Sequence, residues 1–111
     1  MKVAIIGSRD LWVEDFGKYL PENVTEIVSG GARGIDSAAR QYAQKMNIKL
    51  TEFLPDYDQL GHRAPLLRNL EIIDYSDLVL AFWDGQSRGT RFVIENCRKQ
   101  GKPCKIFMAK K

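Results

Sequence analysis

Short apolar runs alternate along the chain with segments whose apolar residues recur at helical spacing. Five runs predict β-strands, at residues 2–6, 26–29, 49–54, 77–83 and 104–108. The runs 3–6 and 78–82 are apolar at nearly every position, as in strands that are buried on both faces of a parallel sheet. These two runs are therefore expected to lie at the centre of the sheet.

Four helices are predicted between the strands. The first spans residues 12–20, whose apolar residues recur at helical spacing until Pro21 ends the helix. The clearest amphipathic helix spans residues 35–46, and a third begins at Pro65 and runs through residue 73. The last helix ends at Gly101, and its apolar positions are Val93, Ile94 and Cys97.

The predicted order is β-α-β-α-β-α-β-α-β, with a polar, irregular loop at residues 56–64. Strands that alternate with helices favour a mostly parallel sheet that is covered on both sides. We therefore expect an α/β fold, a Rossmann-like three-layer sandwich with a mostly parallel five-stranded sheet in the order 3-2-1-4-5. Because no repeat or linker interrupts the pattern, residues 1–111 are expected to form a single domain.

Composition adds little about partners. The chain has 111 residues, and its 17 lysines and arginines exceed its 14 acidic residues by three. Proteins dedicated to duplex DNA usually carry a larger and more clustered basic excess, whereas single strands and nucleotides remain compatible with this charge. The longest basic run is Lys110-Lys111, which is expected to be a solvated end.

Cysteine usage and hydropathy indicate a cytoplasmic protein. Cys97 and Cys104 form neither a zinc pattern nor a disulfide framework, so reduced thiols are expected. The run 3–6 is too short for a signal peptide, and no run approaches the roughly 20 apolar residues of a membrane span. No metal site is predicted, since His62 is the only histidine and no other ligand cluster surrounds it.

Three turns that follow predicted strands are rich in glycine and small polar residues. They are Gly7-Ser8-Arg9, Ser29-Gly30-Gly31-Ala32-Arg33-Gly34-Ile35-Asp36 and Asp84-Gly85-Gln86-Ser87-Arg88-Gly89-Thr90. Ligands of open parallel sheets bind beyond the carboxyl ends of the strands, near the point where the strand order reverses. The expected strand order brings all three turns to one crevice there.

Each turn offers groups that suit a phosphate or a sugar. Ser8 and Arg9 can donate hydrogen bonds to an anion, and the free amides at the helix start near Gly34 favour phosphate. Asp36 either satisfies amides in the first helical turn or holds a ribose hydroxyl, and both roles are left open. Asp84 likewise either forms its turn or accepts a hydrogen bond from a ribose or a base.

Further polar residues are candidates for the same crevice. Ser87 is free to contact a phosphate, Thr90 is the predicted N-cap of the last helix, and Arg68-Asn69 adds a guanidinium and an amide. Taken singly, each turn is also explained by ordinary turn structure. The convergence of three such turns is what predicts a ligand site.

The three turns, together with Arg68-Asn69, resemble the SLOG superfamily of Rossmann-like domains, in particular its small stand-alone bacterial members. The resemblance covers residues 2–108 and implies binding of a nucleotide or nucleotide-derived ligand, a role as a sensor, and assembly into a homodimer or higher homo-oligomer. No metal or further cofactor is expected. The candidate binding residues are Gly7, Ser8, Arg9, Ser29, Gly30, Gly31, Ala32, Arg33, Gly34, Asp36, Arg68, Asn69, Asp84, Ser87, Gly89 and Thr90.

Two relatives in this superfamily imply alternative functions. The LONELY GUY-type phosphoribohydrolases cleave the base–ribose bond of nucleoside monophosphates, and in that alternative Asp36 or Asp84 would be the catalytic group. Their glutamate follows the last Gly-Thr motif by two to three residues, whereas here the next acid after Thr90 is Glu95, more than one helical turn away. The third alternative is single-stranded DNA binding, because the DNA-processing protein of natural transformation is similar at residues 29–36 and 68–69.

Overall fold

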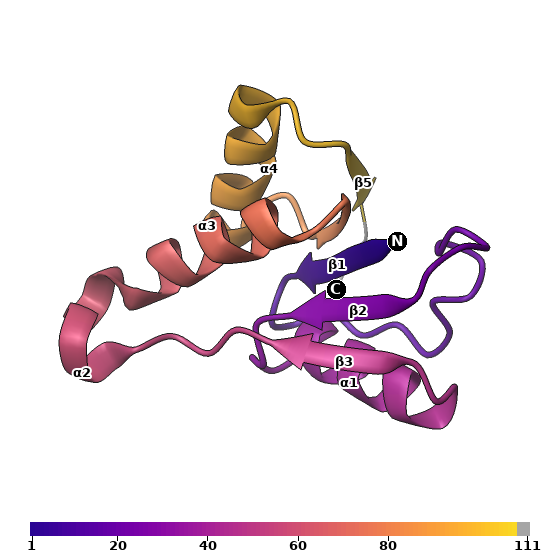
Figure 1. The fold of residues 1–111 in the computed structure, drawn as a ribbon. Coiled ribbons are helices and arrows are strands. Elements are labelled where there is room, and N and C mark those ends of the chain that lie inside the picture. Colours follow the sequence, from indigo (N-terminus) through magenta and orange to yellow (C-terminus); the bar gives the residue numbers. More distant parts are fainter. Residues whose placement is uncertain (109–111) are drawn as a thin grey trace.

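A five-stranded sheet forms the centre of the computed structural model, which describes residues 1–108 (Figure 1). The predicted solvated end, Lys110-Lys111, lies outside the described residues. Neighbouring strands are parallel throughout, in the order β3-β2-β1-β4-β5, which confirms the predicted fold class and strand order. The strands are β1 (Lys2–Gly7), β2 (Glu26–Ser29), β3 (Lys49–Glu52), β4 (Leu78–Trp83) and β5 (Cys104–Met108).

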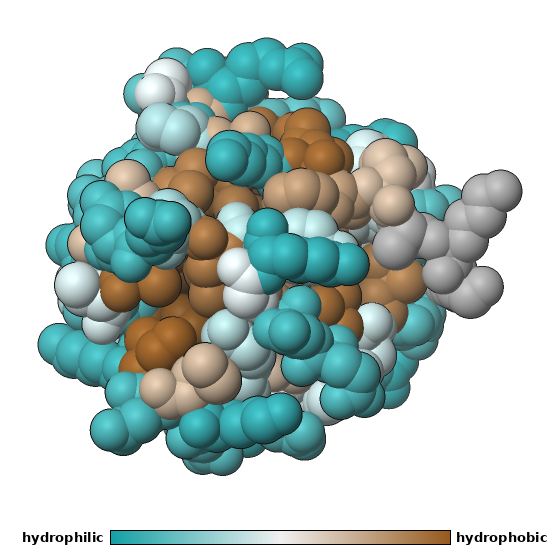
Figure 2. Space-filling view, turned by 90° about the vertical axis from the view of Figure 1, so that its right-hand side faces the viewer, coloured by the Kyte–Doolittle hydropathy of each residue, from teal (hydrophilic) through white to brown (hydrophobic). Residues whose placement is uncertain are grey.

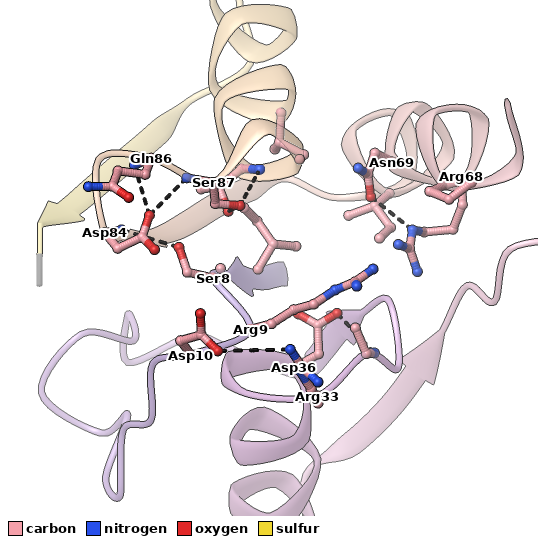
Figure 3. A pocket seen from close by; sticks show the side chains of 18 residues that line it. Ser8, Arg9, Asp10, Arg33, Asp36, Arg68, Asn69, Asp84, Gln86 and Ser87 are labelled. Carbon is pink, nitrogen blue, oxygen red and sulfur yellow. Dashed lines mark hydrogen bonds and ion pairs between the residues drawn. The ribbon is translucent and has the colours of Figure 1, made fainter. Parts of the chain in front are cut away.

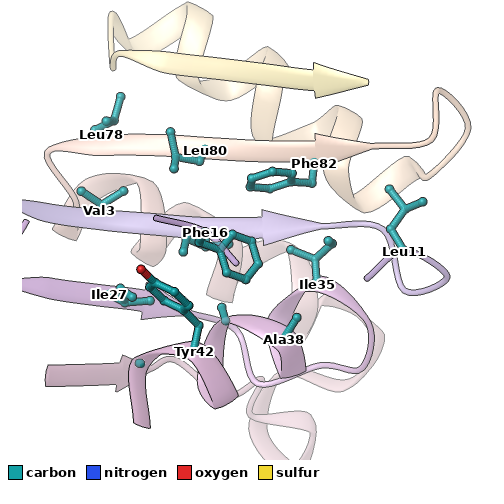
Figure 4. Close-up of a cluster of buried hydrophobic side chains, with 13 residues drawn as sticks. Val3, Leu11, Phe16, Ile27, Ile35, Ala38, Tyr42, Leu78, Leu80 and Phe82 are labelled. Carbon is teal, nitrogen blue, oxygen red and sulfur yellow. The ribbon is translucent and has the colours of Figure 1, made fainter. Parts of the chain in front are cut away.

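Helices cover both faces of the sheet. Side chains of β1 alternate between two apolar clusters, because successive residues of a strand point to opposite faces. Val3 and Ile5 pack with residues of α1 (Ile35–Lys45) in the cluster of Figure 4. Their neighbours along the strand pack instead with α3 (Ala64–Tyr75) and α4 (Arg88–Gln100). The predicted three-layer arrangement is confirmed.

The predicted helix at residues 12–20 is wrong. This segment crosses the α1 face without regular structure, and its turns use other bonds: the Asp15 carboxylate accepts from the Gly17 amide at 2.8 Å. Such local side-chain bonds compete with helix formation. The helical spacing instead reflects contacts with the sheet, because Phe16 is fully buried and meets the rings of Tyr42 and Phe82 edge to face.

The loop predicted at residues 56–64 is more ordered than expected. It contains a single turn of helix, α2 (Tyr57–Leu60), and a 3-10 turn, η1 (Gly61–Arg63), which leads directly into α3. Asp56 begins this structure because its carboxylate accepts from the Gln59 amide at 3.2 Å. Asp56 is therefore the N-cap of α2.

The two ends of the sheet differ in character. Figure 2 faces the amino ends of the strands, where apolar side chains lie in separate patches between polar ones. Just inside this end, the buried Glu26 carboxylate accepts from the Tyr75 hydroxyl at 2.5 Å and the Thr51 hydroxyl at 2.7 Å. Its other oxygen lies 3.4 Å from the Lys49 ammonium. Both oxygens of this buried carboxylate therefore have partners.

Candidate functional site

A cavity of about 450 Å³ opens at the carboxyl ends of β1 and β4 (Figure 3). The turns after β1, β2 and β4 all contribute to its walls, and α3 closes one side. Its lining comprises Ile6, Gly7, Ser8, Arg9, Asp10, Ala32, Arg33, Asp36, Pro65, Arg68, Asn69, Ile72, Asp84, Gln86, Ser87, Gly89, Thr90 and Val93. The three glycine-rich turns therefore meet where the strand order predicts.

Most of the candidate binding residues line this cavity. Gly30 and Gly31 line an adjoining hollow of about 300 Å³, which shares Arg9, Ala32, Arg33 and Arg68 with the first cavity and is completed by Leu54, Pro55 and Tyr57. Ser29 and Gly34 belong to neither lining. Ser29 is fully buried, and Gly34 has a positive φ of 73° with no room for a Cβ against the Arg9 backbone. Both therefore shape the turn that carries the site.

The lining also includes residues that the sequence pattern does not single out. Asp10 follows a predicted site residue directly, and Gln86 lies inside a predicted turn, so both were within reach of the motif argument. The apolar floor, formed by Ile6, Ile72 and Val93, could not be told from ordinary core residues. An apolar position carries the same pattern whether it faces a helix or a cavity.

Ser8 ties the turn after β1 to the turn after β4. Its backbone amide donates to the Phe82 carbonyl at 3.0 Å, and its hydroxyl oxygen accepts from the Asp84 amide at 3.2 Å. Because a hydroxyl that accepts one bond keeps its own proton, the Ser8 side chain still has a donor to offer. Ser8 is thus both a structural link and a possible hydrogen-bond donor at the cavity wall.

Arg68 connects α3 to the turns after β2 and β3. Its Nη1 donates to the Gly30 carbonyl at 2.6 Å and to the Phe53 carbonyl at 3.3 Å, while its Nε donates to Asn69 Oδ1 at 2.8 Å. Burial lowers the pKa of Arg68, Asp36 opposes this, and the neighbouring positive charge of Arg9 lowers it further. In Figure 3 the Arg9 and Arg68 side chains extend toward one another over Asp36, so two cations share one wall.

Asp36 lies in the first turn of α1 with 6% of its surface exposed. Its Oδ2 accepts from the Ala32 amide at 3.1 Å, as expected of a carboxylate that satisfies amides at a helix start. Its Oδ1 is also buried and has no hydrogen-bond partner within residues 1–108. Burial raises the pKa of Asp36 to about 6, although the Ala32 hydrogen bond and Arg68 lower it. A backbone hydrogen bond to Gly30 also lowers this pKa, so the carboxylate is held by more than one group of the turn before α1.

Asp84 and Ser87 organise the turn before α4. Asp84 Oδ1 accepts from the Gln86 and Ser87 amides, each at 2.8 Å, which is the turn-forming role left open for this residue. The predicted N-cap Thr90 is wrong: Ser87 is the cap, and its hydroxyl accepts from the Thr90 amide at 3.4 Å. The helix begins earlier because the Asp84 turn ends at Ser87.

Trp83, Cys97 and Cys104 lie outside the cavity lining. The Trp83 indole donates to the Ser87 carbonyl at 3.1 Å, and Arg91 lies over its ring. Cys97 and Cys104 are free thiols. Within the described chain, no His, Cys, Asp and Glu side chains gather in a group of three that could hold a metal, and no helix is long and apolar enough to cross a membrane.

Comparison with known proteins identifies the family. The model of the family described as DNA recombination-mediator protein A matches residues 1–57. This chain belongs to that family. The matched part contains β1, β2, α1 and β3, and with them the two turns that hold Arg9 and Asp36. The match is consistent with the broader SLOG resemblance without specifying it.

A phage protein is also similar to this chain. The chain is 36% identical over 83 residues to the Gene 61 protein of Mycobacterium phage D29. That alignment covers 69% of this chain and 66% of the phage protein, just under two thirds of its length. No solved structure matches the chain.

Proposed function

We propose that the cavity at the carboxyl ends of β1 and β4 binds a nucleotide through its phosphate and sugar. The observation that carries this proposal is the meeting of three glycine-rich turns around one cavity of about 450 Å³. That volume lies within the range of small-molecule sites, and the position is the one where open parallel sheets bind ligands. The lining mixes arginines with aspartates, which suits a ligand that carries both anionic and hydroxyl groups.

The phosphate fits the side of the cavity that offers donors. Arg9 is exposed and lines both hollows, and the Arg68 guanidinium lies near enough for the two charges to affect one another. Gly89 and Thr90 place the first turn of α4 at the cavity edge, where helix amides lack partners inside the helix. We assign the main contact with the phosphate to Arg9, because Arg68 already donates to the Gly30 and Phe53 carbonyls.

The base fits the adjoining hollow. Leu54 and Tyr57 line it with 67% and 56% of their surfaces exposed, and the half-buried Gly31 brings bare backbone against it. An exposed ring beside bare backbone is a surface on which a flat base can stack. Because the two hollows share Arg9 and Arg68, one nucleotide can reach both.

Family membership favours a second candidate, in which the bound nucleotide belongs to a single-stranded nucleic acid. The family is described as a mediator of DNA recombination, and its model matches the turns that hold Arg9 and Asp36. Cleavage of the base–sugar bond stays a prediction without added support, since Glu95 is exposed on α4 and lies outside the cavity lining. Homo-oligomerisation and a role as a sensor also stay predictions.

Binding is tested with the four nucleoside 5′-monophosphates and with short single-stranded oligonucleotides, by calorimetry and by thermal shift. A ligand at a hundred times its Kd adds about 2.7 kcal/mol of stability, enough to raise the Tm by several degrees. Arg9→Ala is expected to weaken binding at least about tenfold, since a hydrogen bond to a charged group is lost. Lys99→Ala is the matched control, because Lys99 is exposed in the last turn of α4, at the other end of that helix from the cavity.

The proposal fails if neither class of ligand binds, or if Arg9→Ala and Lys99→Ala change affinity equally. Binding of monophosphates and oligonucleotides with similar affinity supports the single-nucleotide site. Oligonucleotide affinity that exceeds monophosphate affinity by orders of magnitude favours the second candidate instead.

A further inference from the structure

The two cysteines lie together, away from the cavity. Cys97 is fully buried in the last part of α4 and belongs to the apolar cluster on the α3 and α4 face of the sheet. Cys104 is the first residue of β5, and it packs against that same cluster with part of its surface exposed. Because β5 begins at the amino end of the parallel sheet, the chemistry of this pair does not depend on the proposed nucleotide site.

The pleat of β5 determines the face on which Cys104 lies. Successive residues of a strand point to opposite faces, and Phe107, three positions further on, packs on the α1 face. Cys104 therefore points to the α4 face, beside its register partner Val79, which is fully buried in the same cluster as Cys97. The connection between helix and strand is also held, because the Lys102 amide donates to the Cys97 carbonyl at 2.9 Å. The backbone thus brings the two thiols together.

A hydrogen bond joins the two sulfur atoms and makes them differ in reactivity. It raises the pKa of the Cys97 thiol, and burial raises it further. The same bond lowers the pKa of Cys104, an effect that burial opposes and the charge of Arg98 reinforces. Cys97 therefore keeps its proton and donates it to the Cys104 sulfur. Since the thiolate is the nucleophile in cysteine chemistry, Cys104 is the reactive member of the pair, and it is also the one with exposed surface.

A reactive thiol with a second thiol in contact with it is the arrangement in which oxidation ends at a disulfide. We propose that Cys97 and Cys104 form a dithiol site that a hydroperoxide converts reversibly to a disulfide. The free thiols of the structure are the reduced state of this site. The disulfide would join the end of α4 to the start of β5.

The reaction takes two steps, in which the two thiols together lose two electrons and the peroxide gains them. In the first, the Cys104 sulfur attacks a peroxide oxygen and the O–O bond breaks. The rest of the peroxide leaves as an alcohol, or as water, after taking up the proton that Cys104 released, and Cys104 becomes a sulfenic acid. In the second, the Cys97 sulfur attacks the Cys104 sulfur and the S–O bond breaks. The hydroxyl leaves as water with the Cys97 proton.

The test treats the reduced protein with hydrogen peroxide, blocks the remaining thiols with iodoacetamide and measures the mass of the denatured chain. Wild type is expected to become lighter by two hydrogens and to take up no alkyl group. Non-reducing electrophoresis should show a monomer, and dithiothreitol should restore two thiols that alkylate. Wild type alone therefore decides whether the disulfide forms, whatever the stability of any variant.

Two variants assign the roles of the cysteines. Cys97→Ala leaves a small apolar side chain at the buried position, and its oxidation is expected to stop at the sulfenic acid of Cys104, which dimedone traps. Cys104→Ala leaves only the buried thiol. Its Cys97 is expected to react with peroxide at least about tenfold more slowly than Cys104 does in Cys97→Ala. Circular dichroism before oxidation checks that both variants are folded.

The outcomes separate the disulfide from the order of the two steps. The disulfide is overturned if peroxide leaves both wild-type thiols open to alkylation, carries either of them to a sulfinic acid instead, or links two chains. Equal peroxide rates for the single thiols of the two variants overturn the assignment of Cys104 as the attacking group. None of these results bears on whether a nucleotide binds at the cavity.

Discussion

Burial of Asp36 makes the stability of the fold depend on pH. In the unfolded chain this carboxyl has its ordinary pKa of 3.8, whereas burial raises the pKa to about 6 in the folded protein, with Glu52 adding to the rise and the Ala32 amide and Arg68 opposing it. The folded state therefore holds the proton more tightly. The stability that the protonated Asp36 carboxyl contributes is complete below about pH 4 and is lost as the pH rises through about 6. The loss amounts to about 3 kcal/mol at neutral pH.

Asp36→Asn removes the ionisable carboxyl, and with it the loss of stability at neutral pH. The variant is expected to exceed wild type in free energy of unfolding by about 1–3 kcal/mol at about pH 7.5, and this advantage shrinks toward about pH 4. Urea unfolding of both proteins across that range measures the difference, in which the opposite contributions of Glu26 and Asp77 cancel. A difference that does not change with pH would mean that Asp36 titrates in the folded protein as it does in the unfolded chain.

At the scale of elements, the segment between β1 and β2 packs on the same face of the sheet as α1, as a helix would, but it has no regular structure. Phe16 is fully buried in the core, and its ring contacts Tyr42 of α1 and Phe82 of β4. Trp12, four residues earlier, has 45% of its surface exposed and its indole donates to Glu14. The segment is thus anchored by one aromatic side chain rather than by a continuous apolar stripe.

Phe16→Ala is expected to lower the free energy of unfolding by about 3–5 kcal/mol, because it removes a fully buried ring. Trp12→Ala, the control within the same segment, is expected to cost less than about 1 kcal/mol. Neither variant should change the far-ultraviolet helix signal of the folded protein, since the segment contains no helix. Similar costs for both variants, or a loss of helix signal in either, would contradict the described anchoring.

The elements show how far sequence reasoning reaches. Strands and α1 were predictable because their apolar patterns arise from regular periods that few other structures produce. The segment at Phe16 was not, because an irregular chain over a sheet can place apolar residues at helical spacing by contact alone. The cavity position followed from strand order, whereas the roles of Arg68 and Asp36 depend on which backbone groups lie within about 3 Å, and spacing along the chain does not specify that.

Across the whole molecule, polar groups are divided between the two ends of the sheet. At the amino end, Glu26, Thr51, Tyr75 and Lys49 satisfy one another, and the pKa of Glu26 is lowered because these partners outweigh the effect of burial. At the carboxyl end, donors and acceptors remain turned toward a cavity. The stabilising network and the candidate site are therefore separated by the length of the strands, so changes at one need not disturb the other.

The overall charge sets the expected salt dependence of binding. The net charge is only +3, and of the arginines at the cavity Arg33 faces Asp10 at 3.9 Å while Arg68 holds two carbonyls. One to three phosphate contacts are therefore expected, which gives a slope of log K against log salt between about −0.7 and −2 for a single strand. Affinity should fall roughly 3- to 20-fold between about 50 and 200 mM salt.

Titrations of a single-stranded oligonucleotide at several salt concentrations measure this slope, and Arg9→Ala should make it shallower by about 0.7, one contact's worth. Lys99→Ala should leave it unchanged, because that charge lies at the far end of α4. A slope steeper than about −3 would require more phosphate contacts than the cavity provides. Binding would then extend over a surface beyond the three turns, and the cavity would hold one nucleotide of a longer bound strand.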